Sequence, residues 1–396
     1  EASKQAYEAV LRATGLPDGW TFDALPSYTL EVPFADGGGM QKAIDDALAA
    51  SKKECYQVTD IEVTGDATAI TGDDWTALKD CYKDGSAWTS LSGLDLSGMA
   101  VLKGVSGLDG DNDAFDRLVT LKLPDRLEYV GIYTFFKCGN LVLSEIPANV
   151  SLIGDHAFSG CKGLERMSFP DGLIAVDESA FEGCASLKEL SFGGNTPPKL
   201  GADAFKDVAA GGTVYCPDAK TYEDSFGANG PSGWTYEPFY TLEVAFDGGD
   251  GSGTAMQAAI DAALAKAGKG KIGAKDIKVT GDATKMTGVH DWGDLERCYQ
   301  RGSAWANLSG LDLSGMGELT EVSGVEGRVT KDPYYDRLVD LKLPSSLETI
   351  GEYAFQNCYN LVLDELPSGL EAVGENAFDC CYSLALDKLP SGLTSI

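Results

Sequence analysis

The chain has 396 residues, of which 43% are hydrophobic, and its 31 basic and 61 acidic residues give a formal net charge of −30. This length suggests two or three domains, and the hydrophobic content is sufficient for a buried core. The acidity opposes binding to phosphate backbones and anionic lipid, and no apolar run reaches the roughly 18 residues of a membrane span. We therefore expect no nucleic-acid binding and no membrane insertion, whereas cationic partners or calcium are compatible with the charge.

Residues 1–27 predict a short helix, because Ala6, Val10 and Leu11 recur at helical spacing before Gly15 and Pro17. Two interpretations stay open for this segment: an N-terminal lead-in, or the tail of a preceding domain. Residue 1 is Glu instead of Met, so we expect that a preceding segment, such as an export signal, has been removed.

A small α/β section is expected next, over residues 28–90. Leu30–Val32 and Ile61–Val63 alternate like strands, and residues 40–50 between them form an amphipathic helix pattern. Asp73 or Asp74 is the expected N-cap of a second helix. We expect this section to cover the apolar end of the repeat array that follows.

The following residues repeat with a period of 23. The period is visible in Pro124, Pro147 and Pro170, in Phe135, Phe158 and Phe181, and again in Pro344, Pro367 and Pro390. In each coil a leucine-bearing strand should end at the proline, and the phenylalanine should begin a turn of helix that closes the coil over the interior. A fixed period in the twenties predicts a solenoid, with strands of successive coils about 4.8 Å apart.

The whole arrangement occurs twice, since Asp116–Ile146 aligns without gaps to Asp336–Leu366 with 19 of 31 residues identical. The expected fold class is α/β: a leucine-rich-repeat solenoid with 23-residue coils, in two tandem copies, each preceded by a small α/β N-terminal cap. The expected domains are a helical lead-in at 1–27, a cap at 28–90, a first solenoid at 91–194, its C-terminal cap at 195–239, a second α/β cap at 240–307 and a second solenoid at 308–396, which is incomplete at its C-terminus.

The ten cysteines show no zinc signature, because the chain has no CxxC pair. Five of them share one repeat position, which predicts buried free thiols: Cys138, Cys161, Cys184, Cys358 and Cys381. Cys81 and Cys298 occupy matching places, but Cys55 has no counterpart, so a repeated disulfide is not supported. We expect no metal and no cofactor, and the disulfide state of Cys55, Cys81, Cys216 and Cys298 is left open.

The coil motif L-P-x-x-L-x-x-I-G-x-x-A-F-x-x-C-x-x-L, carried by residues 147–164 and 344–361, resembles the BspA-type leucine-rich repeat. The resemblance leaves out only residues 1–27. It departs at Tyr133-Thr134-Phe135, where Thr134 replaces alanine, and at the doubled Cys380-Cys381. It implies an exported protein, at a bacterial cell surface or secreted, associated with adhesion to host matrix proteins or other cells, and it supplies no catalytic residues.

Two groups of residues have the composition of a reactive or metal site. His156 and His290 do not repeat between the modules and have no cysteine partner, so surface histidines are favoured. Asp109, Asp111 and Asp113 alternate as in a calcium loop but lack the closing Glu, which favours a solvated acidic loop. We expect no enzyme and assign no catalytic or metal-binding residue, while calcium binding at Asp109–Asp113 stays open.

The remaining candidate is the outward face of the strands. In L-x-x-L-x-L strands the leucines point inward, so the outward positions supply the candidate ligand contacts Glu165, Arg166, Lys188, Glu189 and Lys342. Leu143 and Leu363 stand where an outward polar residue belongs. Either a bulge or shifted register buries them, or they form an apolar contact on the binding face, and they are therefore included as candidates.

We expect a non-catalytic recognition or adhesion protein that binds a host or cell-surface protein, or in second place a glycan, through many modest contacts along its solenoid faces. The alternative is a structural spacer of a larger surface protein, without a ligand of its own. The sequence leaves the oligomeric state open.

Overall fold

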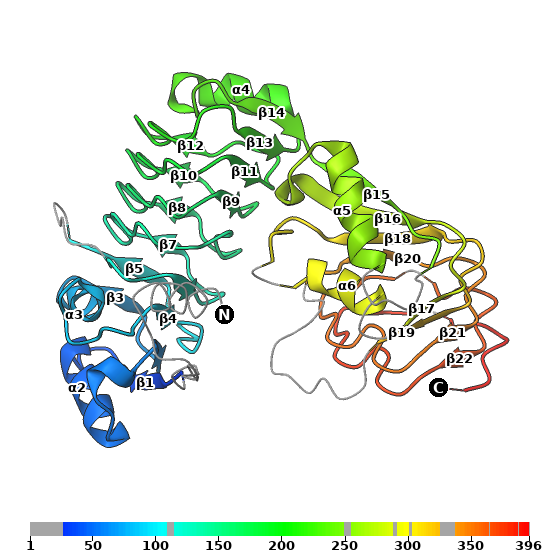
Figure 1. Cartoon of the computed structure of the whole chain (residues 1–396), viewed down its shortest axis with the longest axis horizontal. Helices are drawn as coiled ribbons and strands as arrows, with labels where there is room; N and C mark the ends of the chain where they lie inside the picture. Colours follow the sequence, from blue (N-terminus) through cyan, green and yellow to red (C-terminus); the bar gives the residue numbers. More distant parts are fainter. Residues whose placement is uncertain are drawn as a thin grey trace, which may run out of the picture.

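The computed structural model describes residues 27–108, 115–248, 255–287, 291–300, 303–324, 337–363, 365–386 and 388–395. Two solenoids lie side by side (Figure 1). We call residues 28–239 module 1 and residues 240–396 module 2. Phe239 alone separates the last strand of module 1, β14 (Thr235–Pro238), from the first of module 2, β15 (Tyr240–Ala245). The predicted helix in residues 1–27, the loop Asp109–Asp113 and His290 lie outside the described residues.

Module 1 opens with β1 (Thr29–Pro33), α2 (Met40–Ser51), η1 (Cys55–Gln57), β2 (Asp60–Thr64), β3 (Ala69–Thr71) and α3 (Asp73–Tyr82). The predicted strands and both predicted helices are present, and α2 buries Met40 and Ile44. The predicted N-cap of α3 is wrong, because Gly72 precedes that helix with a φ of 57°. Asp74 instead accepts a hydrogen bond from the Met40 backbone N–H at 2.7 Å, so it caps α2 and ties the two helices together.

Parallel ladders build the coils of module 1. The strands are β4 (Gly93–Asp95), β5 (Gly104–Ser106), β6 (Thr120–Lys122), β7 (Tyr129–Val130), β8 (Leu152–Ile153), β9 (Arg166–Phe169), β10 (Ala175–Val176), β11 (Glu189–Phe192), β12 (Lys199–Leu200) and β13 (Thr213–Cys216). One side of the solenoid carries two sheets, β1-β2-β4-β6 and β9-β11-β13-β14, and the other side carries β3-β5-β7-β8-β10-β12. The helix α4 (Ala219–Phe226) and the short η2 (Gly227–Asn229) precede β14.

The phenylalanines of the repeat fill the interior, as predicted, and their rings form a stack through the core. Ring centroids lie 5.2 Å apart between Phe135 and Phe158 and 5.1 Å apart between Phe158 and Phe181. All three rings are fully buried. Removing one such ring from a packed core costs about 3–5 kcal/mol, so this stack is a main source of cohesion between coils.

The turn of helix predicted at each phenylalanine is instead a run of turns. Phe135 donates its backbone N–H to Ala157 O at 2.7 Å, and Phe158 donates to Ala180 O at 2.8 Å. These donors therefore bond to the next coil and are unavailable for a helix within their own coil. His156 and Ser179, which come just before these segments, adopt left-handed φ values of 55° and 53°.

Module 2 repeats this architecture. Its elements are β15, α5 (Ala255–Ala267), η3 (Lys271–Gly273), β16 (Ala274–Thr280), β17 (Lys285–Thr287), α6 (Asp291–Cys298), β18 (Gly310–Gly315), β19 (Glu321–Ser323), β20 (Asp340–Lys342), β21 (Thr349–Ile350) and β22 (Ala372–Val373). They form the parallel sheets β15-β16-β18-β20 and β17-β19-β21-β22. The buried Trp292 donates to Ala354 O at 2.8 Å, as Trp75 donates to Thr134 O at 2.9 Å in module 1.

The repeated cysteines are free thiols, and four of the five are fully buried: Cys138, Cys161, Cys184 and Cys358. Cys381 is only half-buried. Cys161 and Cys184 donate to the Phe135 and Phe158 carbonyls at 3.0 and 3.2 Å, so the thiols act as small core donors between coils. Burial raises the pKa of Cys184 to about 12.

Candidate functional site

The predicted contacts of module 1 lie together on the outer face of β9 and β11. Arg166 and Glu189 are register partners, and Arg166 Nε lies 3.5 Å from Glu189 Oε2. Glu165 lies 3.8 Å from Arg166, and Lys188 is exposed. Burial raises the pKa of Glu189, and Arg166 opposes this shift. The structure thus places these four side chains on one surface, while their contact with a ligand stays a proposal.

Module 2 covers part of this surface. Any Cβ at Gly270, which precedes η3, would overlap the Glu189 carboxylate, and any Cβ at Gly273 would overlap the Tyr215 ring. Gly270 donates its backbone N–H to the Tyr215 hydroxyl at 2.9 Å. The β11 and β13 strands therefore face η3 directly, and Glu189 lies at the junction between the modules.

A polar cluster closes the centre of the junction. Asn307 of module 2 donates from Nδ2 to Ser191 Oγ at 2.6 Å and to Ile272 O at 2.7 Å. Its Oδ1 accepts from Ser168 Oγ at 3.3 Å, and Ser191 donates to Ser168 at 3.0 Å. Ser191 is fully buried although it points outward from its strand, so burial at this position reflects the second module.

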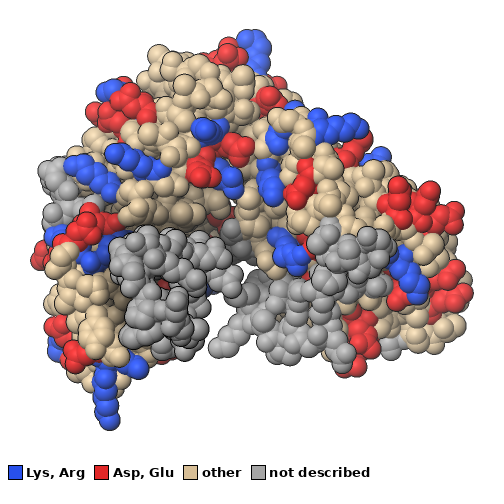
Figure 2. Space-filling model, in the orientation of Figure 1, with Lys and Arg blue, Asp and Glu red and all other residues tan. Residues whose placement is uncertain are grey.

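Ion pairs flank this cluster. Lys269 of module 2 lies 2.8 Å from Glu237 of module 1, and Arg337 of module 2 forms an ion pair with Glu145 of module 1. Acidic and basic side chains are interspersed over the visible face of the molecule, including the region where the modules meet (Figure 2). Periodicity could not predict this junction, because Gly270 and Asn307 replace Glu54 and Ser90 of module 1.

The exposed apolar contact considered for the off-pattern leucines is wrong for Leu363, which is 6% exposed, and Leu143 packs against the core. A shifted register explains their burial. Thr120 bridges to Val142 instead of Leu143, and Asp340 bridges to Val362 instead of Leu363. The exposed apolar side chains of these coils are consequently Val142, at 62%, and Val362, at 49%.

Lys342 belongs to a second surface, on module 2. Register pairs join Glu243, Lys278, Asp312 and Lys342 into one outward row across β15, β16, β18 and β20. Lys342 is 71% exposed at its side chain and lies 3.7 Å from Asp312. The row presents alternating charge, and the predicted contacts therefore fall on two modules instead of one continuous site.

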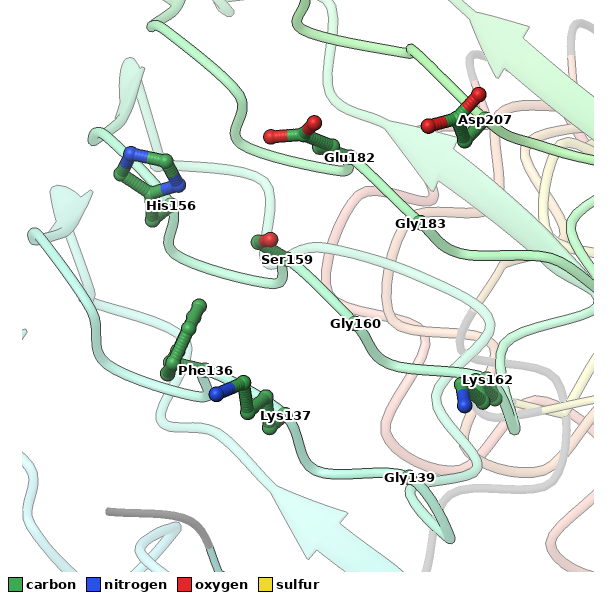
Figure 3. Close-up of a pocket in the computed structure, with 10 residues that line it drawn as sticks. All are labelled: Phe136, Lys137, Gly139, His156, Ser159, Gly160, Lys162, Glu182, Gly183 and Asp207. Carbon is green, nitrogen blue, oxygen red and sulfur yellow. The ribbon is translucent and has the colours of Figure 1, made fainter. Parts of the chain in front are cut away.

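An open groove of about 620 Å³ crosses the turns of module 1 (Figure 3). His156 lies in its wall, with its ring stacked on Tyr133 at 4.9 Å. Two basic and two acidic residues line the groove, so their formal charges cancel: Lys137, Lys162, Glu182 and Asp207. Within the described residues, no group of three or more histidine, cysteine or acidic side chains could hold a metal ion. Tyr133, Phe136 and His156 are half-exposed at this groove, and aromatic residues outside the repeated core position were the sequence signal for it.

The helices of the described part of the chain are too short or too polar to cross a bilayer. The longest of those given above, α5, has 13 residues, whereas a span needs about 20.

Comparison with known proteins places the coils in a family. BspA type leucine rich repeat regions match in six copies, over residues 112–223 and 334–396. No curated protein sequence matches the chain. Among solved structures, a leucine rich cell surface protein from Faecalibacterium prausnitzii A2-165 is similar with 16% identity, a TM-score of 0.33, and coverage of 94% of this chain and 95% of that chain. A leucine-rich repeat protein from Bacteroides ovatus ATCC 8483 (18% identity, TM-score 0.29, 86% and 75% covered) and the pneumococcal vaccine antigen PcpA (15%, 0.29, 85% and 72%) are also similar.

The two solenoids are therefore BspA-type leucine-rich repeat regions, as the coil motif predicted. This class of repeat is associated with protein interaction and with surface proteins, and its members are in general binding or scaffold proteins instead of enzymes.

Proposed function

We propose that the chain is a non-catalytic recognition protein, exported to a bacterial cell surface or secreted, which binds a protein ligand through the outward faces of its parallel sheets. The observation that supports this most directly is the in-register row Glu243, Lys278, Asp312 and Lys342, which offers alternating charges along a rigid strand ladder. Such a row selects partners by charge pattern, with affinity summed over many modest contacts.

On module 1 we assign ligand contact to Glu165 and Lys188, which are exposed, and to the apolar Val142 beside them on the sheet side. Arg166 and Glu189 border the module junction, and we assign them to the pairing of the modules. Adhesion to host matrix proteins or other cells is the expected context, with a glycan as the second ligand class.

The test is binding of the purified chain to immobilised matrix proteins, glycans and whole cells. Lys278→Glu combined with Lys342→Glu should weaken binding about tenfold, because each reversal turns an attraction into a repulsion. Lys220→Glu is the matched control, since Lys220 lies on α4, away from the sheet faces, and is 82% exposed. Retention of full binding by the double variant, and by Lys188→Glu, would sink the sheet-face proposal.

A spacer is the second candidate, and the single-residue connection at Phe239 favours it, because it leaves no free linker between the modules. A spacer without a ligand would bind none of the surfaces in the same panel. Binding that survives every face variant but is lost on unfolding would instead indicate another surface of the chain.

A further inference from the structure

The same short loop follows the first helix of both modules, but its surroundings differ. Module 1 carries Lys52–Gln57 with η1, and module 2 carries Gly268–Gly273 with η3. The residue before each 3-10 turn has nearly the same backbone, with φ −90° and ψ 150° at Glu54 and φ −76° and ψ 147° at Gly270. Two residues further on, Tyr56 is 57% exposed whereas its counterpart Ile272 is fully buried.

Space, and not backbone conformation, favours glycine at position 270. Its φ lies in a region open to every residue, and Glu54 occupies the same region in module 1. What glycine provides is close approach, because a Cβ at Gly270 would overlap Glu189 and a Cβ at Gly273 would overlap Tyr215. The loop of module 2 thus lacks side chains at the points where the sheet of module 1 lies.

The polar groups of the junction are matched as well. The Gly270 N–H meets the Tyr215 hydroxyl, and the Gly270 carbonyl accepts from Tyr240 at 2.8 Å. Lys269 lies against Glu237, and Asn307 bonds both Ser168 and Ser191. Polar groups buried at an interface stabilise it only when they are paired, and these are.

We propose that the Gly268–Gly273 loop, with Asn307 and Arg337, is a dedicated docking device that seats module 2 on the β9–β11–β13 face of module 1 and holds the tandem as one rigid body in solution. The receiving face fits a cationic, glycine-bearing segment. It rejects a loop of the module 1 type, because Glu54 would place a carboxylate against Glu189. The seated loop also covers the part of this face at Glu189 and Tyr215, whereas Glu165 and Lys188 stay exposed beside it. This proposal does not depend on the proposed ligand recognition.

The test uses the full chain with Ser191→Cys as a reporter, since Ser191 is buried beneath Asn307. Labelling of the reporter thiol by N-ethylmaleimide, followed by peptide mass spectrometry, separates it from the native cysteines. We expect slow labelling in the reporter chain and about tenfold faster labelling when Gly270→Glu is added, because opening exposes the face. Glu54→Gly is the matched control in module 1 and should change nothing. Equal rates with and without Gly270→Glu, or labelling of the reporter chain as fast as that of the unfolded chain, would contradict docking.

A charge swap keeps the test informative if Gly270→Glu disturbs folding. Lys269 and Glu237 are each about one-third exposed at their side chains, at 34% and 35%, so their reversal leaves the core intact. Lys269→Glu should accelerate labelling of the reporter thiol about two- to fivefold, and Lys269→Glu with Glu237→Lys should restore the slow rate. Lys53→Glu, at the equivalent position of module 1, is the control. A double variant that labels as fast as Lys269→Glu overturns the proposal, and because no ligand is involved, that failure leaves the proposed function standing.

Discussion

Arg337 of module 2 pairs with Glu145 of module 1 across 192 positions of sequence. The two side chains are only 12% and 24% exposed, and Arg337 also donates to Trp305 O at 3.0 Å. The equivalent Arg117 of module 1 donates to Cys81 O and to the Ser86 hydroxyl, both within its own module. One residue type at one repeat position therefore stabilises a single module in the first copy and the junction in the second.

Arg337→Ala should uncouple the modules. Loss of a charged hydrogen bond from a partly buried site costs about 1.5–3 kcal/mol, and Glu145 would be left without this partner at the junction. We expect the urea unfolding of the chain to separate into two transitions, or to shift to lower urea, in this variant. Lys220→Ala removes a fully solvated pair and should leave the transition in place. An Arg337→Ala chain that unfolds like the parent would show that the pair contributes nothing to coupling.

Leu363→Ala should destabilise the chain far more than Val362→Ala, whereas a regular coil would place both side chains on the outward face. Leu363→Ala opens a cavity in the core and should lower the free energy of unfolding by about 2–4 kcal/mol. Val362→Ala removes a half-exposed side chain and should cost below about 1 kcal/mol. Chemical denaturation of both variants decides the matter, and similar losses for the two would disprove the shifted register.

Asp95 should contribute stability that acid removes. Burial alone would raise the pKa of its carboxyl, but hydrogen bonds from the Ser97 hydroxyl and backbone N–H, with Lys122 at 3.0 Å, more than offset burial and lower the pKa. The folded pKa then lies below the unfolded value of about 3.9, so the stabilisation is present above that value and is lost as the pH falls through the folded pKa.

We therefore expect Asp95→Asn to unfold at lower urea than the parent near pH 7, with the difference closing toward about pH 2. Asp224→Asn is the control, because Asp224 is 65% exposed, and it should change stability by less than about 0.5 kcal/mol at either pH. A gap between Asp95→Asn and the parent that is constant over this range would mean that the carboxylate charge is not the source of the stabilisation.

The buried thiols should resist modification in the native chain. Burial raises the pKa of Cys81, Cys184 and Cys298 to about 12, so almost no thiolate forms at mildly alkaline pH. With Ellman's reagent we expect these three thiols to react only after unfolding, whereas the half-buried Cys380 reacts in the folded chain. Reaction of all of them at one rate before unfolding would show that the coils open readily.

The sequence predicted what its period encodes. The 23-residue spacing placed Phe158 and Cys161 in the core correctly, since a position repeated in every coil meets the same surroundings in each. It left two alternatives open where a coil keeps its length but changes which residue points inward, as at Leu363, and the structure confirms the shifted register that buries this side chain. It placed Arg166 and Glu189 on the outward face, but it could not show that module 2 lies against that face, because contacts between the two copies follow no period.

The break in pairing at Val142 has a mechanical consequence. On that side of module 1, two separate sheets meet at a coil that is paired to its neighbours by the isolated bridges Thr120 to Val142 and Glu145 to Ser168. On the opposite side, the six strands from β3 to β12 run past the same level as one uninterrupted ladder. A load that bends the solenoid therefore meets a continuous ladder along one edge and a break in pairing along the other. Module 1 should bend more easily in one direction, and module 2 contacts it at that break, where Arg337 pairs with Glu145.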